Sequence, residues 1–232
     1  MKKRLTALLL AIAAALAMTA PAFAAEQKDA LELTDIAEEK WYTPAVLFAV
    51  SYGVMDPVSE QDGKGIFVPD APMLREQVAD AVYRFAALAD QKLAEKLSST
   101  EADQCADFDS VSLDCRAAVR FCYGAGVMTG DKERRLHPQN TISRQEFAAV
   151  LQRFVKLYEE KGYMEDVVSA DTLAVGSFTD QTEIAAWARP DIAFCRANGL
   201  MQGNANGTFN PKGEISRAEM AQVLYNLAPR GV

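Results

Sequence analysis

Apolar residues recur at intervals of three and four along three stretches of the chain, which is the spacing of one face of an α-helix. The positions in these stripes are Val78, Ala81, Val82 and Phe85; Phe147, Val150, Leu151 and Phe154; and Met220, Val223, Leu224 and Leu227. The pattern predicts three amphipathic helices that bury these residues in a core.

A second pattern repeats with a period of 73 residues. It consists of a phenylalanine followed by a glycine and a methionine: Phe48, Gly53 and Met55; Phe121, Gly126 and Met128; Phe194, Gly199 and Met201. A fixed long period indicates one supersecondary unit copied in tandem, because a unit of this size cannot bury its own apolar face. We predict three helix-loop-helix copies at residues 31–97, 105–161 and 176–228, each with a first helix that ends at the glycine.

The segments around these helices also repeat. Each copy opens with a short phrase: Leu33-Thr34-Asp35, Phe108-Asp109-Ser110 or Phe178-Thr179-Asp180. Trp41 and Trp187 stand three residues before a proline, which suits a first helical turn. The loop after the first helix carries Phe67 and Pro69, Leu136 and Pro138, or Phe209 and Pro211, with four extra residues in the first copy. Its Asn, Asp and Gly residues favour a turn over a calcium loop, which needs more carboxylates.

The second helix of two copies opens with a capping box, Ser143-Arg144-Gln145-Glu146 and Ser216-Arg217-Ala218-Glu219. All three copies place an arginine at the first helical position: Arg75, Arg144 and Arg217. A cation there opposes the helix dipole, so capping and packing leave it unexplained. A guanidinium beside free backbone N–H groups suits an anion, above all a planar carboxylate. The alternative is a surface arginine paired with a nearby acid.

The first 24 residues predict a cleaved secretion signal, with Lys2, Lys3 and Arg4, an apolar run, and Ala22-Phe23-Ala24 as the cleavage motif. Removing those three basic residues from the 24 in the chain leaves 21 against 32 acidic ones, a formal charge of −11. This charge argues against nucleic acid as a partner. No later stretch is apolar enough to predict a transmembrane segment, so the mature protein is expected to be secreted.

Four cysteines leave disulfides or free thiols open, with three pairings for two bridges. Cys122 and Cys195 share one position in two copies, where the first has Ala49, and this equivalence favours buried free thiols. With a single histidine, His137, and no CxxC pair, we expect no metal site and no cofactor. No nucleophile is paired with His137 by spacing, so we expect no enzymatic activity.

Taken together, the repeated aromatic-x-Asp, Trp, Gly-Leu/Val-Met, Phe-x-Pro and Ser-Arg-x-Glu motifs resemble the S-layer homology family of cell-wall anchoring modules. The resemblance covers residues 31–228. It implies a mainly α fold in which three helix-loop-helix repeats form a pseudo-threefold spindle with grooves between repeats. It also implies noncovalent anchoring at the cell wall or S-layer by binding an anionic secondary cell-wall polysaccharide, commonly one with a terminal pyruvate ketal. Modified peptidoglycan is the other carboxylate-bearing partner.

Position by position, the resemblance implies that Arg75, Arg144 and Arg217 engage the anionic sugar. Trp41 and Trp187 match an aromatic residue that lines the groove and packs on a sugar ring. The glycines at 53, 126 and 199 match a position where backbone approaches the ligand, although a helix stop explains them equally well. Asp35 and Asp180 match an acidic position that accepts sugar hydroxyls or caps the next turn.

Departures from the motifs predict unequal grooves. The second copy has Asp114 in place of Trp, which removes a stacking surface and would repel an anion. The first has Leu74 and Gln77 in place of Ser and Glu, so the intact third copy is expected to contribute most. The alternative function is that of a structural envelope or S-layer-associated protein that assembles with other envelope proteins rather than with a glycan.

Overall fold

The computed structural model describes residues 31–165, 167–168 and 176–228, so the expected secretion signal lies outside the described residues. The chain forms two compact units. Of the described residues, the first unit contains 31–71, Asp80–Lys96 and 216–228, and the second contains Pro72–Ala79 and those between Leu97 and Ile215. None of the described helices is long and apolar enough to cross a membrane.

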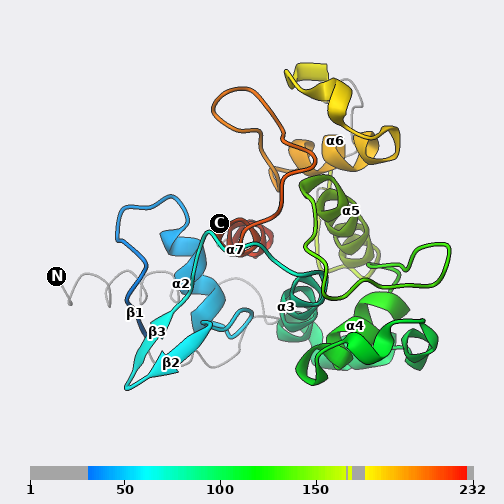
Figure 1. Cartoon of the computed structure of the whole chain (residues 1–232), viewed down its shortest axis with the longest axis horizontal. Helices are drawn as coiled ribbons and strands as arrows, with labels where there is room; N and C mark the ends of the chain where they lie inside the picture. Colours follow the sequence, from blue (N-terminus) through cyan, green and yellow to red (C-terminus); the bar gives the residue numbers. More distant parts are fainter. Residues whose placement is uncertain (1–30, 166, 169–175, 229–232) are drawn as a thin grey trace. The chain divides into compact units, whose positions relative to one another are not determined.

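The first unit combines helices with a small sheet (Figure 1). Its helices are α2 (Thr43–Ser51), α7 (Arg217–Leu227) and the greater part of α3 (Arg75–Leu97), and its strands are β1 (Glu32–Leu33), β2 (Ser59–Gln61) and β3 (Lys64–Ile66). The strand order is β1-β3-β2, with β1 parallel to β3 and β2 antiparallel to it. Helix α2 packs against α7, where the Phe48 ring meets Tyr225 edge-on with 5.6 Å between centroids.

The second unit is helical throughout its described regular elements. Its α-helices are α4 (Arg116–Gly124), α5 (Arg144–Glu160), α6 (Arg189–Ala197) and the first turn of α3. Its short 3-10 helices are η2 (Thr100–Gln104), η3 (Phe108–Ser110), η4 (Leu113–Cys115), η6 (Gln181–Glu183) and η7 (Ala186–Ala188). Helix α5 packs against α6 and α4 packs against η2. The fold is therefore mainly α, as the sequence predicted.

The three second helices begin at the predicted arginines, and their apolar stripes are buried. Phe147, Leu151 and Phe154, for example, are at most 1% exposed. Both predicted capping boxes form, at Ser143 with Glu146 and at Ser216 with Glu219. In the first copy only half of the box remains, because Gln77 Oε1 accepts from the Leu74 N–H at 2.9 Å while Leu74 has no hydroxyl to return the bond.

Equivalent residues just before the three arginines join in a closed ring of backbone hydrogen bonds within the second unit. Met73 N donates to Ile215 O, Ile215 N donates to Ile142 O, and Ile142 N donates to Met73 O, at 2.8, 3.2 and 3.2 Å. All three residues are buried, at no more than 1% exposure. Each of the three residues thus donates one bond and accepts one bond within the ring.

One aspartate in each copy holds the Phe-x-Pro loop of the same copy. The carboxylate of Asp35 accepts from the N–H groups of Phe67 and Val68, that of Asp107 from Leu136 and His137, and that of Asp180 from Phe209 and Asn210. The second residue of each pair has a positive φ, at 55°, 52° and 58°. Two strong bonds to one carboxylate offset the cost of that conformation. In the second copy this aspartate is Asp107, whereas the phrase Phe108-Asp109-Ser110 had placed Ser110 opposite Asp35 and Asp180, so that alignment was wrong by three residues.

None of the four cysteines, which all lie in the described ranges, forms a disulfide, in agreement with the predicted thiols. The buried Cys122 and Cys195 point their thiols at Ala79 O and Ala148 O, at 3.7 and 3.5 Å. Both acceptors belong to second helices, so the two thiols make equivalent packing contacts between successive copies. Burial raises the pKa of Cys195, and the nearby Asp191 carboxylate raises it further.

Candidate functional site

The motif arginines make a common contact with the loop of another copy. Arg75 Nε donates to Leu136 O at 2.9 Å, Arg144 Nε to Phe209 O at 2.8 Å, and Arg217 Nε to Phe67 O at 2.7 Å. The three acceptors are the equivalent loop residues of the second, third and first copies. Each arginine thus fastens its own helix to the loop that precedes another helix, which neither an anion site nor a surface ion pair predicted.

Loop carbonyls also occupy the helix starts that were expected to offer free N–H groups. The N–H of Arg75 donates to Asn140 O and that of Glu76 to Pro138 O. The other two helices repeat this arrangement, with Arg144 on Gly213 O, Gln145 on Pro211 O, Arg217 on Ala71 O and Ala218 on Pro69 O. The expectation of an anion on the free helix N-terminus was therefore wrong at these positions, because the packed loop already satisfies those donors.

Arg144 and Arg217 are held further by a second carbonyl. Arg144 Nη2 donates to Gln202 O at 3.0 Å and Arg217 Nη2 to Asp56 O at 2.6 Å. Both residues are buried, at 6% and 8% exposure. Burial lowers the pKa of Arg217, while Asp35 and Asp56 raise it partway back. These two guanidinium groups serve the internal structure of the fold.

Arg75 keeps one edge of its guanidinium open. Its Nη groups have no hydrogen-bond acceptor among the described residues, and the nearest carboxylate oxygen, Glu146 Oε1, lies 3.9 Å from Nη1. Thr129 is the counterpart of Asp56 and Gln202, but no bond links it to Arg75. Burial lowers the pKa of Arg75, Glu146 and Asp107 raise it, and Arg153 lowers it further. Arg75 is thus a partly buried cation, with 16% of its side chain exposed, that can still accept a ligand.

The open edge of Arg75 faces a groove of about 280 Å³ within the second unit. Its charged lining consists of Arg75, Arg135 and Arg153 with the carboxylates of Asp131 and Glu146. His137 and Trp187 also line it. Trp187 is 55% exposed, so its indole face is available to a ligand in the groove. Residues of all three predicted copies meet here, and cations outnumber carboxylates.

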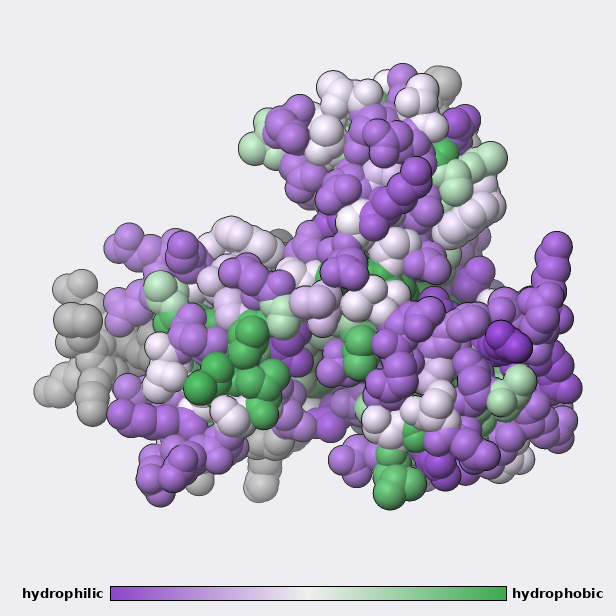
Figure 2. Space-filling view, in the orientation of Figure 1, coloured by the Kyte–Doolittle hydropathy of each residue, from purple (hydrophilic) through white to green (hydrophobic). Residues whose placement is uncertain are grey.

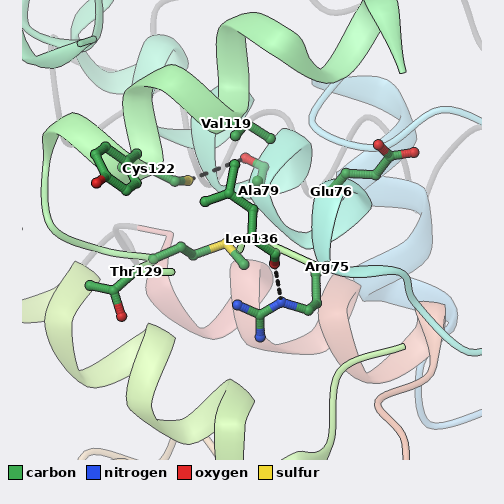
Figure 3. A pocket seen from close by; sticks show the side chains of 9 residues that line it. Arg75, Glu76, Ala79, Val119, Cys122, Thr129 and Leu136 are labelled. Carbon is green, nitrogen blue, oxygen red and sulfur yellow. Dashed lines mark hydrogen bonds between the residues drawn. The ribbon is translucent and has the colours of Figure 1, made fainter. Parts of the chain in front are cut away.

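A small apolar notch adjoins the groove and shares Arg75, Met128 and Thr129 with it. Its volume is about 20 Å³, and apolar side chains such as Val119 and Leu136 form most of its wall. Figure 3 shows the notch beside the Leu136 carbonyl that holds Arg75, with the Glu76 side chain pointing away from the guanidinium. The Glu76 carboxylate instead accepts from the N–H and hydroxyl of Ser112 at 2.9 and 2.7 Å.

The other predicted site residues are not among those that line the groove of Arg75. Trp41 is 61% exposed but belongs to the first unit. The glycines at 53, 126 and 199 follow the ends of α2, α4 and α6 with φ of 66°, 69° and 66°, which fits the helix-stop role. Asp35 and Asp180 direct both carboxylate oxygens to backbone N–H groups. Of the ten predicted residues, Arg75 and Trp187 are the two that this groove brings together.

Sequence reasoning missed several residues of the groove. His137 Nε2 lies 2.7 Å from Asp131 Oδ2, and Asp131 also accepts from the N–H groups of Arg135 and Glu133. The Arg135 N–H lowers the pKa of Asp131 most, followed by the His137 side chain. Arg153 stands nine residues after Arg144, where Arg84 follows Arg75 at the same distance. That recurrence in two copies was the available signal.

The face shown in Figure 2 is mainly hydrophilic, with apolar residues in small groups. The large apolar side chains exposed among the described residues are Trp41, Val58, Ile66, Val68, Leu113, Val168 and Trp187. Trp187 is the one that lines the groove beside Arg75.

We compared the chain with a family model and with known proteins. The S-layer homology domain matches residues 112–148 and 177–221. Relatives include an amylopullulanase of Thermoanaerobacterium thermosulfurigenes, 33% identical over 110 residues, which is 47% of this chain and 6% of the relative. Exoglucanase XynX of Acetivibrio thermocellus is 30% identical over 110 residues, 47% of this chain and 9% of the relative. The surface-layer 125 kDa protein of Lysinibacillus sphaericus is 30% identical over 125 residues, 54% of this chain and 9% of the relative.

These alignments thus span less than a tenth of each of these relatives. The two matched segments fall in the second and third copies, which carry the complete capping boxes. The first copy, with Leu74, Gln77 and the β2–β3 hairpin in place of the shorter loop, lies outside the match. The family resemblance drawn from the sequence is confirmed by these matches.

Proposed function

This chain belongs to the S-layer homology family, and we propose that it anchors noncovalently to a cell wall by binding an anionic, pyruvylated polysaccharide in the groove of Arg75. The three relatives support anchoring through what they share. Two are named as glycan-degrading enzymes and one as a surface-layer protein, yet each aligns with this chain over a small part of its length. A segment common to such different proteins fits attachment better than catalysis.

The open guanidinium edge of Arg75 is the observation that carries the proposal. A carboxylate matches two parallel N–H groups of arginine, and such charge-assisted bonds are stronger than neutral ones. Partial burial strengthens the pairing, because less water competes for the guanidinium. Arg144 and Arg217 already donate both Nε and Nη2 to carbonyls, so Arg75 is the motif arginine best placed to bind an anion.

The apolar notch favours a pyruvate ketal over a uronic acid. A pyruvate ketal carries a methyl group and a carboxylate on one carbon, whereas the carboxylate of a uronic acid has no methyl beside it. With the carboxylate on Arg75, the methyl can enter the notch lined by Val119 and Leu136. Burying one methyl contributes about 0.8 kcal/mol. Trp187 adds an exposed aromatic face on which a sugar ring can pack.

The test is cosedimentation of the mature chain with purified cell walls, before and after acid extraction of the non-peptidoglycan polymer. Arg75→Gln should weaken binding about tenfold or more, since the lost charge-assisted pair is worth at least ~1.5 kcal/mol. Lys132→Gln is the matched control, because it removes an exposed cation that does not line the groove. Binding that survives extraction points to peptidoglycan, and equal binding of Arg75→Gln and wild type rules the proposal out.

Assembly with other envelope proteins is the second candidate. It is favoured by exposed Val58, Ile66 and Val68 around the β2–β3 hairpin of the first unit. In that case the purified protein should form oligomers in sedimentation-velocity experiments, and Ile66→Lys should return it to a monomer. Under the anchoring proposal the same substitution leaves wall binding unchanged.

A further inference from the structure

The second helices carry another arginine, nine residues after the motif arginine, in two of the three copies. These residues are Arg84 and Arg153, and the third copy has Asn226 at that position. Arg84 is neutralised within its own copy, because its Nε lies 2.9 Å from Asp80 Oδ2 and its Nη1 lies 2.5 Å from Asp56 Oδ2. In the first copy this arginine is therefore part of a local ion-pair network.

The second copy keeps the arginine and lacks both of its partners. Ala149 occupies the position equivalent to Asp80, and Thr129 occupies the position equivalent to Asp56. Arg153 is exposed and forms no ion pair or side-chain hydrogen bond with any residue in the described ranges. Loss of two carboxylates around a retained cation leaves a positive charge that the fold itself does not use.

Arg153, Ala149 and Thr129 all line the groove that Arg75 faces. Along α5 the lining residues Glu146, Ala149, Val150 and Arg153 form one helical face. Glu146 lies beside Arg75, so Arg75 and Arg153 stand about two helical turns apart along that face. The two cations affect one another, because Arg153 lowers the pKa of Arg75. Like charges facing one cavity are unfavourable when it is empty and favourable when anions fill it.

Nearby carboxylates do not neutralise Arg153. Glu146 is engaged by the Ser143 N–H and hydroxyl, and Asp131 by His137 and two backbone N–H groups. Asp191, near the start of α6, is another carboxylate that interacts electrostatically with Arg153. Burial raises the pKa of Asp191, and both Arg153 and Lys156 lower it. Asp191 is not among the residues that line the groove, so the ligand-facing side of Arg153 stays open.

We propose that Arg153 is a second anion-binding residue, and that the groove takes a glycan unit bearing two negative groups. The first is the carboxylate on Arg75, which rests on the function proposed above. The second is a carboxylate or a phosphate placed further along α5, on Arg153. Arg153 lies outside the Ser-Arg-x-Glu motif. At the equivalent position the first copy has an ion-paired arginine and the third copy has an asparagine, so a second anion site of this kind is specific to the groove of Arg75.

Three defined probes test the inference by isothermal titration calorimetry with the mature full chain. The 4,6-pyruvate ketal of methyl glucoside carries one charge. The 4,6-pyruvate ketal of glucose 1-phosphate adds a phosphate, and the same ketal sugar linked to glucuronic acid adds a carboxylate. Wild type should bind at least one doubly charged probe about tenfold more tightly than the singly charged one. Which probe gains affinity identifies the second anion.

Arg153→Gln should remove that tenfold gain and leave affinity for the singly charged probe within about twofold. Lys156→Gln is the matched control, since it removes a cation from the next turn of α5 that does not line the groove, and it should keep the gain. Arg75→Gln should weaken all three probes. Because Arg153 is exposed, its substitution should leave the thermal unfolding midpoint unchanged, which confirms that the variant folds.

The outcomes separate the two proposals. If wild type binds all three probes equally and Arg75→Gln loses all three, the role of Arg153 is overturned while the Arg75 site stands. An Arg153→Gln variant that retains the gain overturns it as well. If the gain disappears in Arg153→Gln but Arg75→Gln binds like wild type, the second anion site stands and the proposed carboxylate site fails. A wild type that binds no probe overturns both.

Discussion

Replacing Arg217 by glutamine should destabilise the first unit, because this arginine holds internal carbonyls. Its Nε donates to Phe67 O at 2.7 Å and its Nη2 to Asp56 O at 2.6 Å. The guanidinium carbon lies 4.4 Å from the centroid of the Phe67 ring, and the residue is 8% exposed. Glutamine is shorter and can reach at most one of the two carbonyls.

The size of the effect follows from these contacts. A hydrogen bond from a charged donor contributes about 1.5–3 kcal/mol, and a buried acceptor left without a donor costs about 1–3 kcal/mol. Since these two figures describe overlapping losses, Arg217→Gln should lower the free energy of unfolding by about 3–4 kcal/mol. In a chain of this size each 1 kcal/mol corresponds to about 2–4 °C, so the unfolding midpoint should fall by about 6–16 °C.

Thermal unfolding followed by far-ultraviolet circular dichroism measures this shift. Arg75→Gln is the paired variant, because Arg75 gives up only the Nε bond to Leu136 O. It should lose about 1–2 kcal/mol, or about 2–8 °C, and most of its affinity for cell walls. If Arg217→Gln unfolds at the wild-type temperature yet abolishes wall binding, the assignment of Arg217 to internal structure is refuted, and the three arginines have equivalent ligand roles after all.

Three further predictions follow from other contacts. Trp187→Ala should weaken wall binding several-fold and leave the unfolding midpoint within a few degrees, since the indole is 55% exposed and lines the groove; a large drop in midpoint with normal binding would contradict the groove role. Asp107→Ala should lower the free energy of unfolding by about 2–4 kcal/mol in urea titration, because the N–H groups of Leu136 and His137 lose their acceptors at 2.7 and 2.8 Å. Asp109→Ala, which removes a neighbouring exposed carboxylate that does not bind this loop, should have little effect. Maleimide labelling of the folded protein at neutral pH should spare Cys195, whose pKa burial raises, and modify it only after unfolding; rapid labelling in the native state would show that the thiol is accessible.

The repeat, the helix starts and the stop glycines could be predicted from sequence because each depends on local chemistry. A capping box needs only Ser143 and Glu146, and a helix stop needs only a residue that tolerates positive φ. The apolar stripes specify buried faces in the same way. For these features, the determining interactions lie within a few residues of one another along the chain.

The roles of the arginines could not be assigned from sequence, because their partners are distant. Arg217 bonds to Phe67, which lies 150 residues away, and Arg144 bonds to Phe209 across 65 residues. The motif in a single copy shows only that a cation stands at the start of a helix. It does not show which loop of another copy supplies the carbonyl that the cation binds. The same limit explains Asp107, whose role becomes apparent only when the loop N–H groups of Leu136 and His137 are placed beside it.

The β2–β3 hairpin was missed for a different reason. From the sequence, the four extra residues of the first copy were interpreted as part of a longer loop. In the structure Asp62 and Gly63 form a two-residue turn between two strands, with positive φ of 52° and 73°. Strand β3 then pairs with both β1 and β2, so the short strands are stabilised by one another. Pairing between residues 32 and 64 is not visible in either segment alone.

A crystal structure of residues 25–232 with the 4,6-pyruvate ketal of methyl glucoside tests the central claim most directly. The account predicts the probe carboxylate at about 2.7–2.9 Å from the Nη groups of Arg75, with its methyl in the notch beside Val119. Arg75 Nε should still donate to Leu136 O. A probe bound elsewhere, with the Nη groups of Arg75 turned onto Thr129 O as Arg217 turns onto Asp56 O, would contradict the account.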